Sequence, residues 1–214
     1  ADGNGNDYAI GSTIKMEKGG LELFAQWKLD EYGYSVHYFY DEVEDEDEAE
    51  PGNGLYGSQV TTYKGKPRTK YALDRVENLP LTIGAEVTEN VINVYYAKDD
   101  NEDGTPDKYQ VDVTFKAVNG TFGGTLRETG VKVDLYSWNE ESQKWEETEG
   151  HLKAEQIPAA TADTGYTGGT WDVTPDVKTV ITEDVTYTIT FTKNTFGYSV
   201  HYFYDEVEDE DEAE

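Results

Sequence analysis

The sequence predicts a mainly β protein built as two small domains in tandem, with few short helices. Three observations predict this fold class. The 214-residue chain is rich in Thr, Val and Tyr but poor in the helix formers Ala and Leu, a composition that favours strands. Apolar and polar residues alternate in many short runs. Gly-, Asn- and Pro-containing turn signals separate those runs.

The alternating runs identify the expected strands in chain order. In a strand, residues two apart share one face, so each run offers one face to a core and one to water. A further strand is expected at residues 90–97, whereas 59–63 is the best candidate for a short helix. The alternating runs are residues 21–27, 34–40, 111–117, 131–135 and 185–191.

Two features refine these elements. Strand candidates at 131–138 and 144–147 predict a hairpin that pairs Trp138 with Trp145. Such rings could instead stack on sugars or anchor a protein partner, but cross-strand packing is the preferred interpretation. The expected turns lie at residues 51–54, 119–120, 123–124, 168–169 and 174–176.

An eighteen-residue segment occurs twice in the chain. Residues 33–50 read GYSVHYFYDEVEDEDEAE, and residues 197–214 read the same letters, 164 residues later. An identity of this length indicates a tandem array of that period. We therefore expect one full repeat unit here, followed by the start of the next.

Acidic residues are concentrated in the repeated segment. The chain has 45 acids against 17 bases and a net charge of −28, and residues 41–50 hold eight of the acids in ten positions. This acidic tract could collect calcium or repel a surface. Blocks of like charge are usually solvated, self-repelling loops, and that is the expected state.

The sharpest local motif is the acidic segment at residues 99–107. Oxygen-bearing side chains recur at alternate positions with a glycine at the sixth, as in loops that wrap calcium. The twelfth position is Gln110 instead of the bidentate Glu, which excludes a complete EF-hand. The spacing DxNxDGxxD resembles the calcium loops of thrombospondin type 3 repeats and dockerins. The expected calcium ligands are Asp99, Asn101, Asp103, Asp107 and the Thr105 carbonyl.

Composition also excludes several functions. A strongly acidic chain does not bind nucleic acid through phosphate contacts. With no Cys and three His, disulfides, thiolate sites and His-based catalysis are unsupported. No nucleophile motif is present, so an enzyme is not expected. No apolar stretch of about 20 residues suggests insertion in a membrane.

Residues 29–98 resemble the mucin-binding-protein (MucBP) repeats of Gram-positive surface proteins. The resemblance is carried by YSVHYFYD at 34–41, GSQV at 57–60, LPLTI at 79–83 and NVINVYY at 90–96. It implies a β-grasp-like fold with a short helix across a small mixed sheet, which suits a helix at 59–63.

Residues 109–195 are similar to the Listeria–Bacteroides repeat, the internalin B-repeat module. The matching motifs are VDVTFKAVNG at 111–120, GTWDVTP at 169–175 and TYTITF at 186–191. Residues 8–11 and 21–27 look like the closing strand of another such module. The resemblance implies a string of two alternating β-grasp-like domains.

These observations predict a repeat segment of an extracellular bacterial surface protein, located on the cell surface or wall, that acts as a calcium-stiffened stalk or adhesin. Two alternatives remain open: a binding module for host glycan, mucin or immunoglobulin, and a filament protomer whose strand at 198–204 completes a neighbour's sheet. The expected segments are the end of a preceding B-repeat-like module (1–28), a MucBP-like domain (29–98), a calcium-loop linker (99–108), a B-repeat-like domain (109–195) and the start of the next repeat (196–214).

Overall fold

The structure, a computed structural model, describes residues 6–16 and 18–209. Parts of the first and last predicted segments, at 1–5, 17 and 210–214, lie outside these residues. The chain is mainly β, with 43% strand and 6% helix, and the described part contains no helix of seven or more residues. The predicted fold class is confirmed at this level.

The first sheet is built around a parallel pair formed by its first and last strands. β1 pairs with β7 in parallel register, from Ser35 opposite Val91 to Tyr40 opposite Tyr96. β5 pairs antiparallel with the other edge of β7, and β2 and β3 both pair antiparallel with β1. The strands are β1 (Glu31–Tyr40), β2 (Val43–Glu44), β3 (Glu50–Leu55), β5 (Tyr71–Glu77) and β7 (Val91–Lys98).

The core of the first sheet follows the predicted alternation. Val36, Tyr38 and Tyr40 are buried on one face of β1, and Ile92 and Val94 are fully buried beside them on β7. Burying one face of each strand removes apolar surface from water, which is the main favourable contribution to folding.

The second sheet repeats this arrangement. β8 and β15 pair in parallel from Val113 opposite Val185 to Val118 opposite Thr190. β10 pairs antiparallel with β8, and β14 pairs antiparallel with β15. Its core centres on Val113 and Phe115. The strands are β8 (Gln110–Val118), β10 (Glu128–Asp134), β14 (Tyr166–Trp171) and β15 (Val185–Lys193).

Short elements connect and flank the two sheets. Four two-stranded ribbons are described: β4 (Gln59–Val60) with β6 (Leu81–Thr82), β9 (Gly120–Thr121) with β13 (Thr161–Ala162), β11 (Tyr136–Asn139) with β12 (Lys144–Glu147), and β16 (Tyr202–Tyr204) with β17 (Val207–Asp209). The four 3₁₀ helices are η1 (Glu46–Glu48), η2 (Val87–Glu89), η3 (Asp107–Tyr109) and η4 (Ala154–Gln156).

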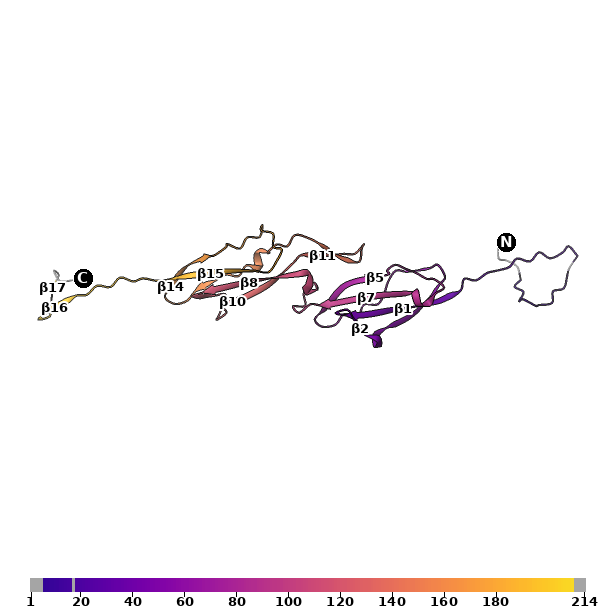
Figure 1. The fold of residues 1–214 in the computed structure, drawn as a ribbon, viewed down its shortest axis with the longest axis horizontal. Helices are drawn as coiled ribbons and strands as arrows, with labels where there is room; N and C mark the ends of the chain where they lie inside the picture. Colours follow the sequence, from indigo (N-terminus) through magenta and orange to yellow (C-terminus); the bar gives the residue numbers. More distant parts are fainter. Residues whose placement is uncertain (1–5, 17, 210–214) are drawn as a thin grey trace.

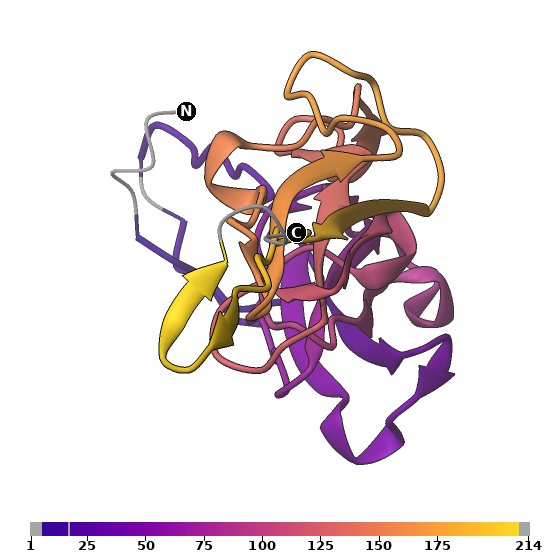
Figure 2. The same ribbon diagram turned by 90° about the vertical axis from the view of Figure 1, so that its left-hand side faces the viewer.

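The two sheets lie end to end, and their strands run along the long axis of the molecule (Figure 1). Viewed along that axis, the two sheets overlap in projection (Figure 2). The chain enters the first sheet at one end of the molecule and leaves the second sheet at the other. The protein is therefore long and narrow.

Several local predictions are wrong, among them the turn expected at 168–169, which lies within β14. The expected helix at 59–63 is instead β4 followed by an irregular segment, because Val60 pairs with Leu81 of β6. The expected turn at 51–54 is part of β3. Gly52 is there because the Tyr34 ring packs against it, and a Cβ at this position would lie 2.3 Å from Tyr34 Cζ.

The run at 21–27 is not a strand in the structure. Leu23 and Trp27 expose 61% and 92% of their surface. Alternation alone does not form a strand, because the backbone donors and acceptors need a neighbouring strand as partner. β15, which lies one period later, has β8 and β14 beside it, and residues 21–27 have no such neighbours within the described chain.

Candidate functional site

The loop at residues 99–107 leaves the end of β7 and leads into η3. Asp99 is 3% exposed, and its two carboxylate oxygens accept hydrogen bonds from the backbone N–H groups of Asp103 (3.1 Å) and Gly104 (2.9 Å). Gly104 has φ of +92°, a conformation that favours glycine. The sharp turn predicted at the sixth position of the loop is therefore present.

Asp103 is the centre of the loop's hydrogen bonding. Its carboxylate accepts from Asn101 Nδ2 (2.7 Å), the Thr105 N–H (2.9 Å) and Gln110 Nε2 (2.7 Å). Burial acts to raise the pKa of Asp103, but these hydrogen bonds outweigh it and lower the pKa below its ordinary value of 3.8. Asp103 is thus held as a carboxylate, the form that a cation requires.

Gln110 completes the loop in a way that the sequence reasoning missed. It occupies the twelfth position, and its Nε2 reaches both Asp103 and Asp134 at 2.7 Å. Its Oε1 is buried without a hydrogen-bond partner, as is Asp107 Oδ1, although Lys132 Nζ lies 3.4 Å from the latter. The sequence contained a signal for this role, because Gln110 lies at the twelfth loop position and an amide oxygen there can also bind calcium.

The structure brings some predicted ligands together and separates others. Asn101 and Asp103 meet, whereas Asp99 accepts hydrogen bonds from the backbone of its own turn. Asp107 accepts from the Asp100 N–H through Oδ2, and its Oδ1 faces Lys132. Within the described residues, no three His, Cys, Asp or Glu side chains are grouped so that they could hold a metal ion. In this conformation, internal hydrogen bonds take the place of a shared cation.

A buried carboxylate next to the loop joins the two sheets. Asp74 is 1% exposed and lies at a bulge in β5, where the register with β7 shifts. It accepts from Tyr109 Oη, and it forms ion pairs with Lys108 Nζ and Arg75, each at 2.7 Å. Bulges commonly redirect a side chain in this way. Burial and Asp74 together raise the pKa of Tyr109, so its hydroxyl remains a donor.

The hairpin β11–β12 makes the second contact between the two sheets, and this contact together with that of Asp74 is here called the joint. Trp138 and Trp145 are directly paired across it, 5.8 Å apart at 66°, as the sequence predicted. Trp145 also stacks on Tyr109 at 5.4 Å and donates from Nε1 to the Leu73 carbonyl at 2.9 Å. The hairpin, which follows β10 of the second sheet, therefore docks on β5 of the first sheet.

The acidic tract at 41–50 is mostly exposed to solvent, as expected, but ion pairs hold it in place of the expected self-repulsion. Its key partner is Arg68, which pairs with Asp45 and with Glu48 (2.9 Å) and lies 3.5 Å from the centre of the Tyr40 ring. Hydrogen bonds from Arg68 lower the pKa of both carboxyls. Cations from the following segment thus offset part of the charge of the tract. The remaining pairs with Lys and Arg are Arg75 with Glu42, Lys66 with Glu48 and Glu50, and Lys64 with Glu50.

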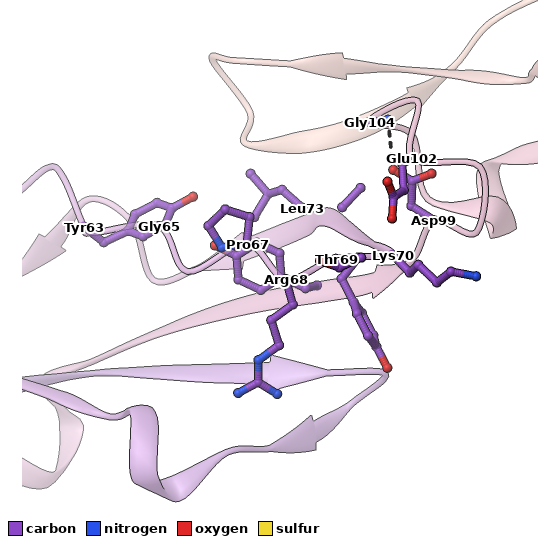
Figure 3. A pocket seen from close by; sticks show the side chains of 13 residues that line it. Tyr63, Gly65, Pro67, Arg68, Thr69, Lys70, Leu73, Asp99, Glu102 and Gly104 are labelled. Atoms are coloured by element: carbon purple, nitrogen blue, oxygen red, sulfur yellow. Dashed lines mark hydrogen bonds between the residues drawn. The ribbon is translucent and has the colours of Figure 1, made fainter.

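A shallow groove of about 550 Å³ lies between residues 63–73 and the loop at 99–107. Figure 3 shows Tyr63 and Pro67 on one side of it and Asp99 and Glu102 on the other. Arg68 points away from it, toward the acidic tract. Burial raises the pKa of Tyr63 to about 12. The groove is thus lined by the rings of Tyr63, Tyr71 and Tyr96 together with charged side chains, of which Arg68 is already paired with the acidic tract.

No family model matches the chain, and no curated protein matches it. None of the helices in the described residues has the length and apolar character needed to cross a membrane.

Proposed function

We propose that this chain is a repeat segment of an extracellular bacterial surface protein and acts as a spacer in a stalk or adhesin. The observation that supports this proposal most strongly is the arrangement of the two sheets. Two small domains lie end to end, and the chain enters at one end and leaves at the other (Figure 1). Units connected in this way add length with each repeat, as in other arrays where a unit contacts only its neighbours.

The joint supports this proposal, because a spacer keeps a greater end-to-end length when its domains do not move relative to each other. Domain pairs move freely unless their interface is substantial. Here Asp74 and Trp145 connect the sheets by buried polar and aromatic contacts. The second copy of the β1 sequence at 197–214 supports repetition of the unit. The bacterial surface location rests on the resemblance of the motifs.

Calcium is the second part of the proposal. Bound at the loop, it would be held by Asp99, Asn101, Asp103, Asp107 and the Thr105 carbonyl, with Gln110 Oε1 at the twelfth position. Gln110 Oε1 lacks a hydrogen-bond partner, and Asp107 Oδ1 has the Lys132 ammonium at 3.4 Å but no hydrogen bond; a hard cation would supply a partner to both oxygens. Asp107 Oδ2 already accepts from the Asp100 N–H of the loop at 3.2 Å, so binding would require Asp107 Oδ1 to exchange Lys132 for the cation.

Small-angle X-ray scattering with and without calcium, together with calorimetry, tests both parts. A spacer has a maximum dimension close to that of the extended domain pair, and calcium narrows the distribution of shapes. A compact particle would reject the spacer. An unchanged profile with no heat of binding would reject calcium while leaving the spacer in place.

A binding module for a host glycan, mucin or immunoglobulin is the second candidate, and the groove beside Tyr63 favours it. A glycan array and a pull-down with one unit test this candidate, with Tyr63→Ala as the comparison. The filament alternative has less support, because β1 already occupies the slot that the strand at 198–204 would fill.

A further inference from the structure

We infer that each sheet is a mechanical clamp that resists tension applied along the chain. This inference deepens the proposed spacer function and rests on it, since a stalk transmits force through its units. It starts from the relation between the first and last strands. In both sheets these strands are neighbours and run parallel.

Tension on a parallel terminal pair acts as shear. Force enters the first sheet at Glu31 and leaves it at Lys98, which lie at opposite ends of β1 and β7. Pulling slides the two strands past each other, so the evenly spaced hydrogen bonds between them are loaded together. Strands pulled apart from one end would instead lose these bonds one at a time.

The hydrogen bonding of the first clamp extends beyond the paired residues at both ends. Ser35 N donates to the Asn90 carbonyl, and Asp41 N donates to the Tyr96 carbonyl, both at 3.0 Å. β1 is also held on its other edge by β3, and β7 by β5. Neither sliding strand is therefore a free edge.

A segment at residues 63–68, here called the strap, crosses both strands of the clamp. Tyr38 Oη donates to the Lys64 carbonyl (2.6 Å), and Tyr40 Oη donates to the Lys66 carbonyl (2.7 Å). Tyr96 of β7 accepts from Lys66 N at 2.8 Å. The strap thus binds β1 and β7 to one piece of backbone, so sliding also has to break these bonds.

The second sheet has the same terminal pair, in which β8 begins the domain and β15 ends it. Phe115 and Tyr187 stack across it at 5.8 Å. Between the two clamps the load passes through the linker and the side-chain contacts of Asp74 and Trp145. We expect the joint to yield first, followed by one abrupt unfolding event for each sheet.

Single-molecule pulling on the full chain tests the clamp. The chain contains no Cys, so two introduced cysteines define where force is applied. Glu31→Cys with Lys98→Cys loads β1 and β7 in shear. Val43→Cys with Lys98→Cys, the matched control, peels the same strands from one end. All three positions are exposed, and the thermal unfolding of both variants is compared with that of the parent chain.

The expected result is an unfolding force several-fold higher in shear than in peeling. Equal forces in the two geometries would overturn the clamp. A second measurement pulls the unsubstituted chain through terminal tags, and it should give two abrupt events with the contour lengths of residues 31–98 and 110–193. Gradual extension at low force would also reject the clamp. If the pulling experiments reject the clamp but scattering still gives an extended particle, the spacer function remains supported.

Discussion

The hydroxyl of Tyr109 donates a 2.7 Å hydrogen bond to Asp74 across the boundary between the two sheets. Asp74 belongs to β5 of the first domain, and Tyr109 directly precedes β8 of the second. The bond thus connects the two domains through a carboxylate that water barely reaches. The geometry of the joint depends on a few side chains such as these.

Replacement of the buried carboxylate tests the joint most directly. Asp74→Asn removes the charge that Lys108, Arg75 and Tyr109 share, and a lost partner of buried polar groups costs about 1–3 kcal/mol. Chemical denaturation should report this loss. Glu42→Gln is the control, because Glu42 pairs with the same Arg75 but is exposed. An equal loss in both variants would contradict the role given to Asp74.

Trp145 should determine whether the domains tumble together. Trp145→Phe keeps a ring in the hairpin but loses the hydrogen bond to Leu73, worth about 0.5–1.5 kcal/mol. Nitrogen-15 relaxation should then show two separately tumbling domains in place of one. Trp138→Phe, which changes the neighbouring ring but no bond across the joint, should leave the tumbling unchanged.

The acidic tract predicts a specific dependence on pH. The pKa values of Asp45 and Glu48 are lowered from 3.8 and 4.5 by Arg68. Their stabilising contribution is therefore fully present above those ordinary values and is lost as the pH falls through the lower folded-state values. Arg68→Gln should lower the melting temperature at pH 7, and its difference from the parent should shrink below about pH 4.

Lys64→Gln is the matched control for that experiment. Lys64 is 74% exposed and lies 3.5 Å from Glu50, and exposed pairs contribute little. Its melting temperature should follow the parent chain at every pH. A difference between Arg68→Gln and the parent that does not change with pH would mean that Arg68 acts through its stacking on Tyr40 alone.

Gln110→Glu tests the calcium proposal by gain of function. The substitution places a carboxylate at the twelfth position beside Asp103 and Asp134, where it is repelled without a cation and becomes a bidentate ligand with one. Stability without calcium should fall, and calorimetry should show tighter calcium binding. Asp103→Asn should weaken binding. If Gln110→Glu lowers stability equally with and without calcium, the loop is not a calcium site.

Much of the fold could be predicted because alternation along a strand directly reflects burial. The runs at 34–40 and 111–117 became β1 and β8, with their apolar faces in the cores. The run at 21–27 shows the limit of this reasoning. Its alternation is as clear as that of the runs at 34–40 and 111–117. A strand also needs a neighbouring strand as hydrogen-bond partner, and that pairing depends on the whole sheet.

The glycines and acids show a second limit. Gly52 looked like part of a turn but lies in β3, because the ring of Tyr34 needs the space that a Cβ would fill. The acidic tract looked like a self-repelling loop, because its cations lie some twenty residues later in the sequence. Asp74 offered a usable signal, a charged residue between the buried Ala72 and Val76 of β5.

The parallel terminal strands also give the molecule a direction. In both sheets the parallel terminal strands run from the same end of the long axis toward the other (Figure 1). A string of such units therefore has two different ends. Two strings lying side by side would bring different surfaces into contact in a parallel arrangement than in an antiparallel one. The parallel and antiparallel packings of these chains in a bundle are therefore not equivalent.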